Sequence, residues 1–225
     1  MTAPKRIGVL GGTFDPIHFG HVDAAAAARR ALDLDHVLLM PARVPPHKAA
    51  SPLASAYHRF AMAALAAADR AELRVSDIEL EQSGPSYTSW TLDRLARAGL
   101  RPAQLFFIAG TDAFAEITAW RDYPDLLSRS HFVVVSRPGN DADRMPQRLP
   151  TLAGRMHAPH GTESTTAADP TRIWLVSAPT RDVSSSTVRA CVERGHAVDR
   201  LVPATVAAHI ARHDLYGRLP GERLA

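Results

Sequence analysis

Two histidines near the start of the chain stand at a spacing that suits them for binding an anion. His18 and His21 are three residues apart and end the run Gly11-Gly12-Thr13-Phe14-Asp15-Pro16-Ile17-His18-Phe19-Gly20-His21. On the first turn of a helix both imidazoles would lie on one face, where each can donate a hydrogen bond to the same group. The unpaired backbone N–H groups of a helix start also attract anions. The stretch therefore predicts a phosphate-binding loop.

A strand before the turn and a helix after it are needed to hold this loop. The apolar run 6–10 has strand character, the alanine-rich run 22–32 is typical of a helix, and 36–40 reads as a second buried strand. Further strands are predicted at 73–76, 104–109, 131–135 and 173–176, and further helices at 55–68, 88–98, 184–193 and 203–213. This alternation predicts an α/β fold, built on a doubly wound and mostly parallel sheet.

The glycine spacing disfavours two common nucleotide-binding loops, because it matches neither Gly-x-Gly-x-x-Gly nor Gly-x4-Gly-Lys-Ser/Thr. The run 11–21 instead closely resembles the signature Gly-Gly-(Ser/Thr)-Phe-Asp-Pro-x-His-x-Gly-His of the nucleotidyltransferase superfamily. That resemblance implies a Rossmann-like nucleotidyltransferase fold. It also implies that the loop binds the triphosphate of a nucleotide, through Gly11, Gly12, Thr13, Phe14, His18 and His21.

Ser184, Ser185 and Arg189 form a second candidate phosphate site towards the C-terminus. Hydroxyls at a helix start, with a guanidinium one turn later, can hold anionic oxygens, although alone they more often mean only a capped helix. The run 182–189 resembles the superfamily's Ile-Ser-Ser-Thr-x-Ile-Arg element, with Ser186 where threonine is usual. The resemblance implies that a small C-terminal helical part, 184–216, closes the triphosphate site.

Further motifs resemble one family within that superfamily, the nicotinate mononucleotide adenylyltransferases. In order along the chain they are Pro45-Pro46-His47-Lys48, Gly84-Pro85-Ser86-Tyr87-Thr88, Gly110-Thr111-Asp112, Trp120 and Arg137-Pro138-Gly139. The resemblance implies that Gly110 and Asp112 border the adenosine of ATP. It also implies a mononucleotide-binding set, which comprises Asp15, Lys48, Ser86, Tyr87, Thr88 and Trp120.

From the residues alone, several of these positions also have plainer interpretations. The run 85–88 could be only a turn capped by Thr88, and Trp120 could simply fill the core. Asp112 is better founded, because it follows a predicted buried strand, and open α/β sheets bind ligands at the carboxyl ends of strands. Lys48 would usually be a solvated charge, yet its proline-rich loop at 41–52 could close over phosphates.

The resemblance predicts adenylyl transfer, in which the 5′-phosphate of nicotinate mononucleotide attacks the α-phosphorus of ATP and expels pyrophosphate. A phosphate oxygen is already ionised at neutral pH, so catalysis can rest on positioning and on neutralising charge. The residues predicted to do this are His18, His21, Lys48 and Arg189. We expect Mg²⁺ to arrive with ATP, held by phosphates and water, without dedicated protein ligands.

Length and composition favour a single domain over residues 1–225. The chain is 46% apolar with a formal net charge of +3, so we expect a sizeable core and no nucleic-acid binding. Cys191 is the sole cysteine, and the first strand begins too early for a signal peptide. With no apolar run near the roughly 20 residues of a membrane span, we expect a cytoplasmic protein. The segment 140–171 lacks periodicity and predicts a loop insertion.

Other functions stay open on the sequence alone. The phosphate motifs report only triphosphate handling, so the acceptor could instead be nicotinamide mononucleotide or phosphopantetheine. A class I aminoacyl-tRNA synthetase fragment would share a motif of the His-x-Gly-His kind, but this sequence lacks a loop that resembles Lys-Met-Ser-Lys-Ser. A non-enzymatic nucleotide-binding regulator would leave the two histidines, Lys48 and Arg189 unexplained. Homo-oligomerisation is compatible with the sequence, which does not decide it.

Overall fold

The computed structural model describes residues 5–45, 52–159 and 170–217. Within these ranges seven strands form a single sheet in the order β3-β2-β1-β4-β5-β7-β6, and all the strand pairings are parallel. The strands are β1 (Ile7–Gly12), β2 (His36–Pro41), β3 (Leu73–Val75), β4 (Leu105–Gly110), β5 (His131–Val135), β6 (Met156–His157) and β7 (Ile173–Val176). The predicted doubly wound parallel fold is confirmed.

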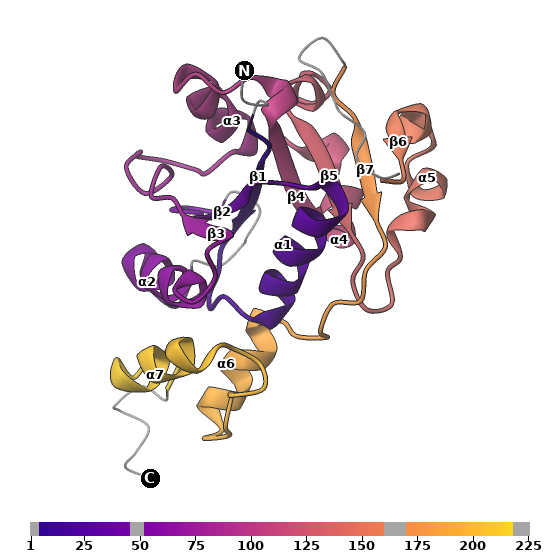
Figure 1. The fold of residues 1–225 in the computed structure, drawn as a ribbon. Coiled ribbons are helices and arrows are strands. Elements are labelled where there is room, and N and C mark those ends of the chain that lie inside the picture. Colours follow the sequence, from indigo (N-terminus) through magenta and orange to yellow (C-terminus); the bar gives the residue numbers. More distant parts are fainter. Residues whose placement is uncertain (1–4, 46–51, 160–169, 218–225) are drawn as a thin grey trace.

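Helices cover both faces of this sheet (Figure 1). They are α1 (Phe19–Leu32), α2 (Ala56–Ala67), α3 (Thr88–Arg97), α4 (Thr111–Ala115), α5 (Met145–Arg148), α6 (Ser185–Glu193) and α7 (Ala204–Arg212). Apolar residues of α1, α2, α6 and α7 belong to one buried layer, and those of α3, α4 and α5 belong to the other. The C-terminal helices α6 and α7 lie together beyond one end of the sheet, near the start of α1 (Figure 1).

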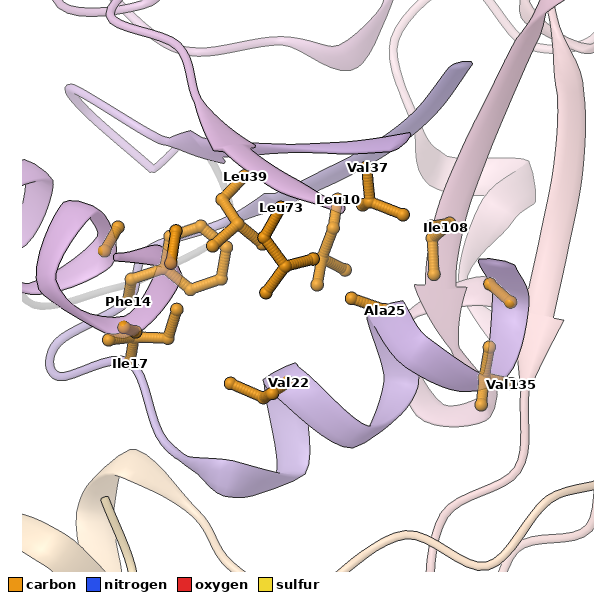
Figure 2. Packing of buried hydrophobic residues seen from close by; sticks show 14 of the residues in the cluster. Leu10, Phe14, Ile17, Val22, Ala25, Val37, Leu39, Leu73, Ile108 and Val135 are labelled. Carbon is orange, nitrogen blue, oxygen red and sulfur yellow. The ribbon is translucent and has the colours of Figure 1, made fainter. Parts of the chain in front are cut away.

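Alternate residues of each central strand supply the two apolar layers. In β1, Leu10 packs on the α1 side and Val9 on the α3 side, as the two-residue period of a strand requires. Figure 2 shows Val22 and Ala25 of α1 facing Leu10 and the neighbouring strands. Each large apolar side chain buried in this way contributes about 1.5–3 kcal/mol to folding. The alanines of α1 bring that helix close to the sheet.

The direction of winding reverses between β1 and β4. Strands β2 and β3 lie on one side of β1, whereas β5, β7 and β6 lie beyond β4. In an open parallel sheet this reversal leaves a crevice outside the carboxyl ends of the two central strands. The run 11–21 begins at the end of β1, and Gly110 ends β4. The fold therefore brings two motifs that are far apart in sequence to one crevice.

The segment predicted as a loop at 140–171 contains short elements in its described part. Residues 142–155 form brief helical turns, and β6 adds a parallel edge strand by pairing with β7. Ala142 and Met145 are fully buried against the α3 side of the sheet. Single apolar anchors of this kind produce no periodic pattern, which is why composition indicated only a loop. Residues 160–169 lie outside the described ranges.

In the part of the chain that the structure describes, no helix has the length and apolar character needed to cross a lipid bilayer.

Candidate active site

A cleft of about 360 Å³ opens at the carboxyl ends of the central strands. Gly12 and Thr13 line it at the end of β1, Gly110 and Asp112 at the end of β4, and Arg137 after β5. His21 lines it from the first turn of α1. The structure thus assembles glycines, a histidine and a guanidinium from separate segments around one space that could hold a phosphorylated ligand.

His21 has a fixed orientation within this cleft. Its Nδ1 accepts a hydrogen bond from the backbone N–H of His18 at 3.2 Å. Because Nδ1 is the acceptor, the neutral ring carries its proton on Nε2 and can donate from there. The ring also stacks on that of His18, with centroids 3.7 Å apart, and meets the edge of Phe14 at 5.0 Å. Several contacts therefore hold one donor at the mouth of the motif loop.

His18 occupies a different position from its neighbour, because it is buried and does not line the cleft. Its Nδ1 has no hydrogen-bond partner among the described residues. Burial, and then the positive charge of Arg137, lowers the pKa of His18 from 6.5 to about 3, against a smaller opposing effect of Asp23. The ring is therefore neutral at physiological pH. The sequence predicts that both imidazoles face the same group. In the structure the two rings stack on each other, and of the two only His21 lines the cleft.

Phe14, predicted to bind ATP, lies beneath the cleft rather than in its lining. The ring is 1% exposed and the backbone is left-handed, with φ of 50°. A Cβ on Gly12 would stand 2.8 Å from this ring, so only glycine allows the aromatic side chain to fold back under the loop. Phe14 in turn supports His21.

Asp15, predicted to bind the mononucleotide, faces the interior of the protein. Its carboxylate accepts hydrogen bonds from the backbone N–H groups of Leu53 and Ala54, each at 3.0 Å, and from the hydroxyl of Tyr216 at 2.9 Å. The residue is 3% exposed and is not part of the cleft lining. Its contacts join the motif loop to the start of α2 and to the C-terminal tail.

Arg59 of α2 holds the same loop from below, although it is almost completely buried. Its guanidinium donates to the carbonyls of Thr13 and Ala42 at 2.6 Å each. It also donates to the carbonyls of Arg43 and Ala54. Burial lowers the pKa of Arg59, while the charge of Asp15 raises it. One cation therefore ties the loop after β1 to the loop after β2.

The serine-rich element closes on the motif loop from the opposite side. Ser184 caps α6 by accepting a hydrogen bond from the N–H of Thr187 at 3.0 Å. Ser185 donates to the carbonyl of Pro16 at 2.9 Å, and Arg189 donates to the carbonyl of Asp15 at 2.7 Å. The structure thus places the three predicted residues against the loop, but not among those that line the cleft.

A salt bridge fastens the segment before α6 to the first helix. Arg181 donates to both carboxylate oxygens of Asp23, at 2.9 and 2.8 Å, and lies over the ring of Phe19. Burial alone would raise the pKa of Asp23, but the hydrogen bonds and charge of Arg181 lower it below its usual value. A Cβ on Gly20 would meet both the ring of His18 and the carbonyl of Arg181, so glycine permits this close packing.

The other side of the cleft is built by elements that cover the α3 face. Ser86, Thr88 and Trp120 line it together with Phe107 of β4, whose ring lies 5.9 Å from that of Trp120. No side chain caps the N-terminus of α3, and Thr88, the first residue of that helix, lines the cleft. Tyr87 is not part of the lining, because its ring packs against Trp90 and under Arg121.

Several residues of the cleft lining were not among the predicted site residues, and Arg137, Thr180 and Glu79 are three of them. Arg137 lies against Gly110, where a Cβ would come within 3.2 Å of its side chain. Thr180 lies in the segment after β7 and lines the cleft, and its hydroxyl donates to the carbonyl of Ser136. Glu79 enters from the loop between β3 and α3. For Arg137 a signal exists, since it stands two residues after the end of the buried strand β5 and so lies at the carboxyl edge of the sheet.

Lys48 lies outside the described residues. Within the described ranges, no group of three or more His, Cys, Asp or Glu side chains is arranged to hold a metal ion. The cleft residues Asp112 and Glu79 supply single carboxylates from separate elements.

Comparison with known families matches residues 9–191 to the cytidylyltransferase-like family. The fold, the motif loop and this match define the chain as a nucleotidyltransferase of the cytidylyltransferase-like class. A Roseiflexus sp. (strain RS-1) protein named "Probable nicotinate-nucleotide adenylyltransferase" is 42% identical over 210 residues, covering 93% of this chain and 97% of the relative. A Desulfatibacillum aliphaticivorans protein of the same name is 38% identical over 225 residues, covering 94% and 99%. The chain belongs to the nicotinate-nucleotide adenylyltransferase family.

A solved structure shows the same fold at much lower identity. It is the Plasmodium falciparum nicotinic acid mononucleotide adenylyltransferase complexed with NaAD, with a TM-score of 0.70 and 16% identity. The match covers 94% of this chain and 97% of the other. The resemblance identified in the sequence is confirmed.

Proposed function

We propose that this protein transfers the adenylyl group of ATP to the 5′-phosphate of nicotinate mononucleotide, forming nicotinate adenine dinucleotide and pyrophosphate. One observation carries the proposal. A single cleft is lined on one side by the motif loop, His21 and Gly110. On the other side it is lined by Thr88, at the start of α3, and by Trp120. Two ligands bound on these two sides would meet at the reversal point of the sheet. The names of the relatives support the same reaction.

In this mechanism a mononucleotide phosphate oxygen forms a bond to the α-phosphorus while the bond to the β-phosphate oxygen breaks. Pyrophosphate leaves with the electron pair of that bond, and no protein nucleophile is needed. His21 donates from Nε2 to the phosphates, and Arg137 neutralises charge from the end of β5. Orienting two bound reactants in line lowers the barrier by roughly 7–11 kcal/mol. Electrostatic stabilisation of the developing charge adds to this effect.

Ser185 and Arg189 take part by holding the loop that binds the triphosphate. Their bonds to the carbonyls of Pro16 and Asp15 fix the path of the chain between β1 and α1. Reorientation of Arg189 towards a bound phosphate would extend this role. Lys48, which follows β2 in the sequence, completes the proposed charge-neutralising set.

Magnesium enters this reaction as part of the substrate, the complex of Mg²⁺ with ATP. The donors that Mg²⁺ prefers are oxygens, and the phosphates of ATP supply them. The single carboxylate of Asp112 borders the cleft on an exposed position after β4, suited to the ribose hydroxyls of the nucleotide.

On the acceptor side, the uncapped N-terminus of α3 offers backbone N–H groups to the carboxylate of nicotinate. Trp120 offers an indole face to the pyridine ring. Thr88 begins α3 and so provides the first of these N–H groups. This arrangement favours binding of nicotinate mononucleotide, whose pyridine ring carries a carboxylate, over nicotinamide mononucleotide, whose ring carries a neutral amide.

The test is to incubate the purified protein with Mg-ATP and one acceptor at a time, measuring pyrophosphate and the adenylylated product. Nicotinate mononucleotide is expected to react best, nicotinamide mononucleotide more slowly, and phosphopantetheine not at all. Product with phosphopantetheine alone would contradict the acceptor assignment. Binding of ATP without turnover of any acceptor would instead favour a regulator.

A further inference from the structure

Glu79 is a buried carboxylic acid in the cleft for which the reaction has no evident use. It lies in the loop between β3 and α3, is 6% exposed, and lines the cleft with Ser86, Thr88 and Trp120. Burying an ionisable side chain is costly unless hydrogen bonds compensate for the lost water. Its partners therefore indicate what it does.

Two hydroxyl groups donate to this carboxylate. The Oγ1 of Thr91, one turn into α3, lies 2.5 Å from Oε1 of Glu79, and Ser86 supplies a second side-chain hydrogen bond. Burial raises the pKa of Glu79, while these two hydrogen bonds and the charge of Arg94 act in the opposite direction. Both donors belong to the turn and helix start that form the proposed acceptor side.

The hydroxyl of Ser86 has partners on two sides within the protein. It has one proton, which it donates to Glu79, and its oxygen accepts the backbone N–H of Arg43 at 2.9 Å. The backbone N–H of Ser86 donates to the carbonyl of Val44 at 2.8 Å. Ser86 therefore joins the loop after β2 to Glu79, and the one proton that its hydroxyl can donate is used inside the protein.

The loop that carries Glu79 is itself held on both sides. Arg43 donates through Nη1 to the carbonyl of Leu80 at 2.7 Å. Arg94 of α3 donates to the carbonyl of Ile78 and pairs with Glu81 at 3.0 Å. These contacts hold the carboxylate of Glu79 in place between the loop after β2 and the first turn of α3.

We propose that Glu79 is a positioning residue, which fixes the Ser86–Thr88 turn so that its backbone N–H groups are aligned for the pyridine mononucleotide. It acts through Ser86 and Thr91 and does not contact the substrate. This inference rests on the proposed function, since it concerns the acceptor side of the same cleft. It also assigns Ser86 an internal role in place of a direct contact with ligand.

The test compares Glu79→Ala, Ser86→Ala and the double variant by steady-state kinetics. Each single variant is expected to raise KM for nicotinate mononucleotide about tenfold, which corresponds to the loss of one hydrogen bond to a charged group. KM for ATP is expected to stay unchanged. Because the two residues act as one unit, the KM of the double variant should not exceed the higher of the two single-variant KM values. Calorimetric titration with nicotinate mononucleotide alone checks affinity without turnover.

Two further variants keep the inference open to contradiction if Glu79→Ala folds poorly. Glu79→Gln retains one acceptor oxygen and should give a KM between wild type and Glu79→Ala. Glu193→Ala, an exposed glutamate at the end of α6 and outside the cleft lining, is the matched control and should leave KM unchanged.

Three outcomes would overturn the positioning role. A rise in KM with Glu79→Ala but not with Ser86→Ala would mean that the carboxylate contacts the substrate itself. Additive effects in the double variant would mean that the two residues act separately. Equal loss of ATP and mononucleotide binding would mean a general role in folding. Failure of the wild-type protein to adenylylate nicotinate mononucleotide would instead contradict the proposed function.

Discussion

The hydroxyl of Tyr216 donates a hydrogen bond to Oδ1 of Asp15 at 2.9 Å, joining positions 201 residues apart in the sequence. The same oxygen accepts the backbone N–H of Ala54, and Oδ2 accepts that of Leu53. Burial, and then the charge and hydrogen bond of Asp15, raises the pKa of Tyr216, so the phenol keeps its proton. The motif loop, the start of α2 and the C-terminal tail therefore meet on one buried carboxylate.

Replacing Tyr216 by Phe should destabilise the protein, because it removes a donor from a buried, charged acceptor. We expect the free energy of unfolding to fall by about 1.5–3 kcal/mol, measured by urea denaturation. Tyr57→Phe is the control, since the side chain of Tyr57 is 76% exposed, and it should change stability little. Equal stability of Tyr216→Phe and wild type would show that the hydrogen bond is not formed in solution.

His21→Asn should reduce turnover severely while leaving the fold intact. The amide oxygen can still accept the N–H of His18, but the donor at Nε2 is lost. Removing one such donor typically lowers kcat by about 100-fold to 1,000-fold. The measurement is kcat with Mg-ATP and nicotinate mononucleotide, with His196→Asn on an exposed position as the control. A change of less than threefold would remove His21 from the proposed mechanism.

His18 should make the stability of the protein depend on pH. Its pKa is about 3 in the folded protein and 6.5 without that burial, so the unfolded chain binds the proton first as pH falls. The stabilising contribution is thus complete above pH 6.5 and is lost progressively towards pH 3. We expect the stability difference between wild type and His18→Asn to decrease by up to about 1.4 kcal/mol per pH unit in this window.

Comparing those two proteins cancels the titration of the other histidines, which both share. Urea denaturation at pH 7, 6 and 5 gives the difference directly. A difference that stays constant from pH 7 to pH 5 would show that His18 is accessible to protons in the folded state.

Trp120→Ala should weaken binding of the pyridine mononucleotide and leave ATP binding unchanged. Stacking of an aromatic ring on a base contributes about 1–3 kcal/mol, so KM for nicotinate mononucleotide should rise by about tenfold or more. Trp120→Phe should retain part of this effect. Trp90→Phe is the control, because Trp90 packs on Tyr87 and Arg121 outside the cleft lining. An unchanged KM for Trp120→Ala would identify Trp120 as part of the apolar core only.

The sequence alone predicts most of the fold, because buried parallel strands are continuous apolar runs. The runs at 131–135 and 173–176 coincide with β5 and β7, and the run at 36–40 becomes β2, which extends through Pro41. Pro41 can end this strand because its missing N–H falls on the last position of the ladder. Alternation with helices and the handedness of the connections do not fix the order of the strands, because they leave open the strand at which the winding reverses.

The internal supports of the site could not be predicted in the same way. Arg59 lies on a helix among alanines, and nothing in its spacing indicates that it donates to four carbonyls, one after β1 and three between β2 and α2. Glu79 stands in a polar turn that reads as exposed, yet the fold buries it. Motifs identify residues by type and position, whereas burial depends on contacts between segments that are distant in sequence.

The contact between Tyr216 and Asp15 cannot form during synthesis until residue 216 has been added to the chain. The N-terminal part of a protein leaves the ribosome first and begins to fold while the rest is being made. At that time the run 11–21 is present. Ser185, Arg189 and Tyr216, which form hydrogen bonds to Pro16 and Asp15 in the folded protein, have not yet been synthesised. A product of premature termination would therefore carry the complete signature motif and still lack the clamp that holds it.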